Sequence, residues 1–134
     1  MNILVIGSGA REHAIVRALK RSPKDKEIFC LGSNINPGIT EHCAALAVGN
    51  INDTHTITTY AKKKTVDLAI IGPENPLAVG VADVLWDSGV RVVGPRKDLA
   101  QIETSKAFTR DLLTEYNISG CPKYKTFSSL SGVE

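Results

Sequence analysis

The sequence predicts an α/β domain with a doubly wound, mainly parallel sheet. Short apolar runs alternate with helix-like segments along most of the 134 residues, which is the pattern of parallel strands joined by helical crossovers. The run at 66–71 is almost wholly apolar, as a central strand covered on both faces should be. Breaks rich in Gly, Asn and Pro follow three of the runs, at the sheet edge where such folds bind ligands.

Five strands and four helices are expected in alternation. Strands fit 2–6, 27–31, 44–48, 66–71 and 91–93, and helices fit about 11–21, 53–64, 77–87 and 97–116. The helices carry apolar residues at helical spacing, whereas the strands are short apolar runs. The segment 32–40, which is rich in Gly, Asn and Pro, is expected to be a loop.

Local signals mark the helix ends. Asp53 or Thr54 can cap the second helix, and the lysines in its last turn suit the helix dipole. Pro76 suits the first turn of the third helix, and Gly89 suits its C-cap. The last helix is expected to break near 103–105.

The C-terminal residues predict an unfinished unit. A strand-like run at 123–127 has nothing after it with which to pair, and 128–134 resembles a helix N-cap region whose helix does not follow. We therefore expect the chain to be a fragment of a longer protein, with its last residues partly docked or mobile.

The three breaks are expected to lie on one edge of the sheet. Polar residues from them could converge on one small ligand; they are Arg11, Asn34, Asn36, Glu74 and Asn75. The first break joins a strand to a helix through Gly7 and Gly9, and unpaired amides at a helix start favour an anion, usually phosphate. The alternative is that these glycines only make a tight turn.

The first break departs from known nucleotide motifs. The dinucleotide-binding fingerprint G-x-G-x-x-G requires a third glycine, and this sequence has Glu12 there. The fingerprint also requires a carboxylate at the end of the second strand, and none is present, so the sequence departs from it at two positions. The P-loop pattern is absent as well. We expect a phosphate site that takes neither NAD nor a nucleoside triphosphate. Glu12 is expected to interact with the helix N-terminus or with Arg11, and His13 to be structural.

The composition limits the classes of partner that the protein is expected to bind. Sixteen basic and fourteen acidic residues give a net charge of +2, without the concentrated basic patch typical of nucleic-acid or membrane binding. Three widely spaced cysteines show no metal-ligand spacing and suit a reduced, cytoplasmic protein. Met1 leads directly into a strand, so we expect neither a signal peptide nor a transmembrane segment.

Four segments, in order, resemble one enzyme family. Val5-Ile6-Gly7-Ser8-Gly9-Ala10-Arg11-Glu12-His13-Ala14 resembles the opening of phosphoribosylamine–glycine ligase, or glycinamide ribonucleotide synthetase. Segments 34–39 and 72–80 resemble its P-G-N-x-G-[TI] and G-P-E-x-P-L-x-x-G motifs, and 94–108 resembles its G-P…A-x-L-E-x-S-K-A-F. Three departures are Ala10 in place of glycine, two extra residues before Pro37, and Asn75 at a usually apolar position.

The resemblance implies an ATP-grasp enzyme that joins 5-phosphoribosylamine to glycine with ATP and Mg²⁺ (or Mn²⁺). Residues 1–100 would be the Rossmann-like, pre-ATP-grasp domain that binds the phosphosugar, and 101–134 a helical linker and the incomplete start of the ATP-grasp domain. The implied substrate-binding residues are Gly7, Ser8, Gly9, Arg11, Asn36, Gly38, Pro73 and Glu74.

Lys106 would reach toward the ATP phosphates; otherwise it is an exposed helix lysine. Catalytic and metal-binding residues are expected beyond Glu134, so the chain alone is expected to be inactive, with small-molecule partners only and a monomeric state favoured. The alternatives are the leading domain of another ATP-grasp enzyme (biotin carboxylase or a purine-pathway carboxylase or formyl transferase), a dinucleotide-binding module, and a complete phosphosugar-binding module without enzymatic activity.

Overall fold

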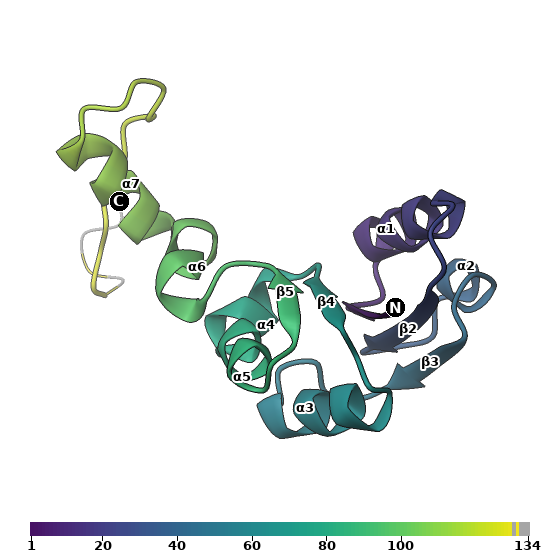
Figure 1. Ribbon diagram of the computed structural model, residues 1–134. Coiled ribbons are helices and arrows are strands. Elements are labelled where there is room, and N and C mark those ends of the chain that lie inside the picture. Colours follow the sequence, from purple (N-terminus) through teal and green to yellow (C-terminus); the bar gives the residue numbers. More distant parts are fainter. Residues whose placement is uncertain (130, 132–134) are drawn as a thin grey trace.

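The computed structural model describes residues 1–129 and 131. Its centre is a five-stranded parallel sheet with strand order β3-β2-β1-β4-β5 (Figure 1), which confirms the predicted fold class. The strands are β1 (Asn2–Ile6), β2 (Glu27–Gly32), β3 (Ala45–Val48), β4 (Leu68–Ile71) and β5 (Arg91–Val93). The helices are α1 (Ala10–Arg21), α2 (Pro37–Thr40), α3 (Thr54–Lys63), α4 (Glu74–Ala78), α5 (Val81–Asp87), α6 (Lys97–Thr104) and α7 (Lys106–Glu115).

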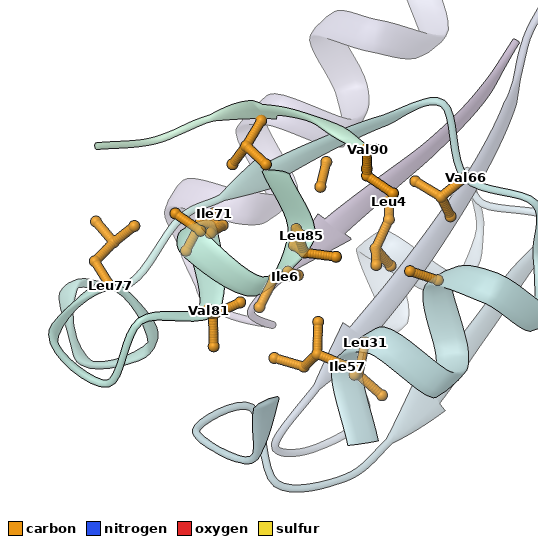
Figure 2. Close-up of a cluster of buried hydrophobic side chains, with 14 of the residues drawn as sticks. Leu4, Ile6, Leu31, Ile57, Val66, Ile71, Leu77, Val81, Leu85 and Val90 are labelled. Atoms are coloured by element: carbon orange, nitrogen blue, oxygen red, sulfur yellow. The ribbon is translucent and has the colours of Figure 1, made fainter. Parts of the chain in front are cut away.

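Helices cover both faces of the sheet, because successive residues of a strand point to opposite faces. Leu4 and Ile6 of β1 belong to the larger core, which α3, α4 and α5 cover. Figure 2 shows Ile57 of α3 beside Leu31 of β2 in this core. Val5 points to the other face, where α1 and α2 pack. The strands thus connect two separate cores.

Asp53 is the residue that caps α3. Its carboxylate accepts hydrogen bonds from the His55 N–H at 3.0 Å and from the Thr56 hydroxyl at 2.5 Å. The Thr56 bond, followed by the His55 bond, lowers the pKa of the Asp53 carboxyl, because both favour the ionised form. Two lysines lie in the last turn, as expected.

Two segments differ from the expected elements. The chain between β4 and β5 forms α4 and α5 rather than one helix at 77–87. Gly80 separates them with a φ of 87°, a left-handed conformation that glycine tolerates and that ends a helical run. The loop expected at 32–40 contains the one-turn α2, which is too short to produce a helical period. Gly89 has a φ of 83° after α5, which confirms its terminating role.

The helical segment after β5 breaks at Ser105, within the expected interval. Ser105 ends α6 and caps α7, where its hydroxyl accepts from the Phe108 N–H at 3.3 Å. The strand expected at 123–127 is wrong: these residues are irregular, and a strand without a neighbour is not stable. Of the predicted N-cap region at 128–134, residues 130 and 132–134 lie outside the described part. The division at residue 100 remains a prediction.

Candidate functional site

The loops after β1, β2 and β4 leave the sheet side by side. Ile6 at the end of β1 pairs with Leu31 of β2 and with Ile71 of β4, and all three strands run parallel. Their carboxyl ends therefore share one edge, as Figure 1 shows near the start of α1. We call the loops 7–9, 33–36 and 72–73 the rim.

Two amides of the first loop are used inside the protein. The Gly7 N–H donates to the Leu31 carbonyl at 2.9 Å, with Gly7 at a φ of 112° that glycine readily adopts. The Gly9 N–H donates to Oε2 of Glu12 at 2.6 Å. These glycines therefore shape the loop, and their N–H groups point into the protein rather than toward a ligand.

Glu12 is a buried carboxylate at the start of α1, with a residue exposure of 4%. It fills space that three glycines leave open: an ideal Cβ on Gly7 would lie 2.8 Å from its Cγ, and one on Gly72 would lie 2.6 Å from its Cδ. Its Oε2 accepts from Gly9, and its Oε1 lies 3.9 Å from Nε of Arg11. A negative charge here suits the helix dipole. Both interactions expected for Glu12 are confirmed.

Other amides of the same turn are free. Within the described residues, nothing accepts a hydrogen bond from the backbone N–H of Ser8, Ala10 or Arg11. Ala10 and Arg11 are exposed and Ser8 is partly exposed, and they lie at a helix start, which attracts an anion. Ala10 is the first helical residue, and its methyl group therefore imposes no backbone strain there.

The second loop is tied to the first by side-chain amides. The Ser8 hydroxyl donates to Oδ1 of Asn34 at 3.0 Å, and Nδ2 of Asn36 donates to the Ser8 carbonyl at 3.0 Å. Oδ1 of Asn36 accepts from the Gly38 N–H at 3.0 Å and so caps α2. Gly38 has no room for a Cβ because the His13 ring lies against it. Asn36 and Gly38 thus position the loop, and direct ligand contact remains a prediction.

Arg11 links the first loop to the third. Its Nη1 donates to the Gly72 carbonyl at 2.5 Å, and its Nη2 lies 4.0 Å from Oε2 of Glu74. The side chain is 58% exposed, so it also faces solvent above the loop. Pro73 precedes α4, and its ring packs near Gly7. The expected convergence of Arg11 and Glu74 is therefore present in the structure.

Cys30 lies directly beneath the first loop. Its thiol donates to the Gly7 carbonyl at 3.1 Å. Burial, with smaller contributions from Cys43 and Glu12, raises the pKa of the Cys30 thiol to about 12. The thiol is therefore protonated at neutral pH, and its hydrogen bond to the Gly7 carbonyl helps to hold the first loop in place.

Lys106 is not part of the rim. It is the first residue of α7 and is exposed. Figure 1 shows α7 beyond α6, away from the sheet and from α1. The rim residues and Lys106 are thus two separate groups in the described chain.

One contributor to the rim was missed in the sequence. Gly72 makes room for the Glu12 carboxylate and supplies a carbonyl to Arg11. Its signal was a glycine at the carboxyl end of the most apolar strand. Unpaired amides were expected at this helix start, but the sequence has no side-chain signature for which of them stay free, because backbone direction alone decides it.

The fold and the rim together define a doubly wound α/β domain that presents free backbone amides and Arg11 at the carboxyl edge of its sheet. The family model described as phosphoribosylglycinamide synthetase, N domain, matches residues 1–103. The chain therefore belongs to this family. None of the helices in the described residues has the length and apolar character needed to cross a membrane.

The sequences of known relatives are consistent with this family assignment. The phosphoribosylamine–glycine ligase of Methanocella arvoryzae is 49% identical over 127 residues, which are 95% of this chain and 29% of that protein. The ligase of Methanosarcina barkeri is 42% identical over 96% of this chain and 30% of its own length. The chain spans about 30% of the curated relatives that it matches.

A solved structure supports the fold. N5-carboxyaminoimidazole ribonucleotide synthetase from Thermotoga maritima has a TM-score of 0.72 and 18% identity, over 96% of this chain and 34% of that one. Identity this low shows a shared fold alone. The family match, by contrast, favours the ligase over the dinucleotide-binding alternative.

Proposed function

We propose that this chain is the phosphosugar-binding part of a phosphoribosylamine–glycine ligase, which joins 5-phosphoribosylamine to glycine with ATP. Family membership and relatives at 42% and 49% identity support the reaction. The observation that carries the binding role is the set of free amides at Ser8, Ala10 and Arg11, beside the Arg11 guanidinium. We also propose a cytoplasmic, monomeric protein with small-molecule partners only.

The phosphate would lie against the first turn of α1. Three N–H groups and the exposed face of Arg11 give it charge and hydrogen bonds together. Glu74 lies beside Arg11 and is half-exposed, where its carboxylate would accept hydrogen bonds from ribose hydroxyls or from the amine. Gly7, Gly9, Asn36, Gly38 and Pro73 would hold the three loops in place.

ATP and Mg²⁺ are part of the proposed reaction, and Lys106 would be one contact to the ATP phosphates. Lys106 is a single exposed cation, and an ATP site needs several converging donors. Among the described residues, no group of three or more His, Cys, Asp or Glu side chains converges on a point. We expect no turnover from this chain alone with glycine, ATP and phosphoribosylamine.

Calorimetric titration with ribose 5-phosphate tests the binding role, since this compound stands in for the unstable phosphoribosylamine. We expect saturable binding that Arg11→Ala weakens about tenfold or more. Arg17→Ala is the matched control, because Arg17 is an exposed arginine on the same helix. NAD and ATP should give no heat. NAD binding, or an equal loss in both variants, would overturn the proposal.

A further inference from the structure

We infer that Glu12 determines which kind of phosphate the rim accepts: a terminal monophosphate ester, and not a phosphate that continues into a second phosphate group. The inference rests on the proposed phosphosugar function and adds a specificity-determining residue to it. It follows from the volume that Glu12 fills and from the charges around Arg11.

The Glu12 side chain occupies the space that three glycines, Gly7, Gly9 and Gly72, leave open. In a G-x-G-x-x-G loop the second glycine lets the backbone approach the pyrophosphate, and the third keeps the inner space between helix and strand clear for close packing. Here the Glu12 side chain takes that inner space, within 2.9 Å of an ideal Cβ on Gly7 and 2.6 Å of one on Gly72. The Gly9 N–H, which would face the inner phosphate, is already paired with Oε2 of Glu12. Only the outer donors of the turn remain.

The charges around Arg11 also favour a single phosphate. The Arg11 guanidinium has two carboxylates beside it: Glu12 at 3.9 Å and Glu74 at 4.0 Å. One positive charge against two negative charges leaves this part of the rim with a formal charge of −1. A single phosphate can use the three outer amides, whereas a second phosphate would meet the Glu12 and Glu74 carboxylates that flank the Arg11 guanidinium. The rim is thus suited to one phosphate.

Two ligands separate these cases. Ribose 5-phosphate has a terminal phosphate, whereas ADP-ribose carries the same ribose 5-phosphoryl group joined to a second phosphate. We would titrate both into the wild-type chain, Glu12→Gly, Glu12→Gln and the control Ala14→Gly, and follow the ratio of the two affinities. Ala14 is exposed on the same helix, so its variant reports the effect of one added glycine in α1.

Glu12→Gly should raise the affinity for ADP-ribose relative to ribose 5-phosphate about tenfold. Glu12→Gln keeps the volume and removes the charge, so it should raise the ratio only about threefold. Ala14→Gly should leave the ratio unchanged. A folded Glu12→Gly with a wild-type ratio would overturn the inference, as would an equal gain in Ala14→Gly. A merely structural role for Glu12 would weaken both ligands alike and leave the ratio unchanged.

The wild-type chain provides a test that needs no folded variant. In amide NMR spectra, ribose 5-phosphate should shift the Ser8 and Ala10 resonances and leave Gly9 nearly unmoved, because Glu12 holds the Gly9 N–H. A Gly9 shift as large as that of Ser8 would overturn the inference. If no amide moves, the proposed function fails; if Gly9 moves together with Ser8 and Ala10, the proposed function stands and the inference about Glu12 fails.

Discussion

Replacing Gly72 with alanine should destabilise the fold at the rim, because the added methyl group would clash with the buried Glu12 side chain. The new Cβ would lie 2.6 Å from Cδ and 2.7 Å from Cγ of Glu12, and such distances cannot be accommodated without movement. Glu12 is buried, so its carboxylate would have to leave the Gly9 N–H to which it is bonded at 2.6 Å. Losing a hydrogen bond to a charged group costs about 1.5–3 kcal/mol, and over-packing costs about 1–3 kcal/mol.

The expected loss in the free energy of unfolding is therefore about 2.5–6 kcal/mol, the sum of those two ranges. Urea unfolding followed by circular dichroism measures it. Gly49→Ala is the matched control, because its Cβ would lie 3.5 Å from Leu31 and Thr56, an ordinary contact. Both substitutions restrict the unfolded chain alike, so the difference between them isolates the clash.

Two results would refute this reasoning. One is a loss in Gly72→Ala no larger than that in Gly49→Ala. The other is additivity with Glu12→Ala: removing the carboxylate opens the space, so the cost of Gly72→Ala should fall strongly in that background.

Three further outcomes are expected from the described contacts. Ile57→Ala, at a fully buried position, should lower the free energy of unfolding by about 2–5 kcal/mol, while Ile35→Ala, at 68% exposure, should change it by less than about 0.5 kcal/mol; equal losses in urea melts would contradict the core assignment. Because the folded-state pKa of Asp53 is depressed, its stabilising contribution is complete above the ordinary pKa of 3.8 and is lost as the pH falls through the lower folded value. Asp53→Asn should therefore lose less stability between pH 7 and pH 3 than wild type, and the same loss in both would be evidence against the cap. Cys30, with a thiol pKa of about 12, should react with iodoacetamide at pH 8 far more slowly than Cys121 in peptide mass spectra, and comparable rates would show that the loop above Cys30 opens readily.

The parallel sheet was predicted well because each strand is a short apolar run that is bounded by turn-forming residues. Prediction from the sequence failed where the deciding feature was not periodic. Gly80 splits a helix by adopting left-handed backbone, and α2 is a single turn held by the Asn36 cap. The strand expected at 123–127 has suitable residues but no neighbouring strand, and pairing is a tertiary property.

Some features of the candidate site could likewise be predicted from the sequence, and others could not. Gly7, Gly9 and Arg11 could be identified from a strand–glycine–helix pattern, since the anion-binding tendency of a helix start is local. The pattern could not show that the Gly7 and Gly9 amides point inward. It could predict that Arg11 and Glu74 share an edge of the sheet, but not their separation of 4.0 Å.

The sequence by itself determined the fold class, the family and the position of the rim, because apolar spacing and ordered motifs are properties of the chain. Only the tertiary structure decided which donors are left for a ligand. The β1–β4 pairing brings Gly72 against Glu12 across 60 residues of sequence, and this buried carboxylate then takes the Gly9 N–H. The free donors are the amides that remain after those long-range contacts are made, which no local pattern records.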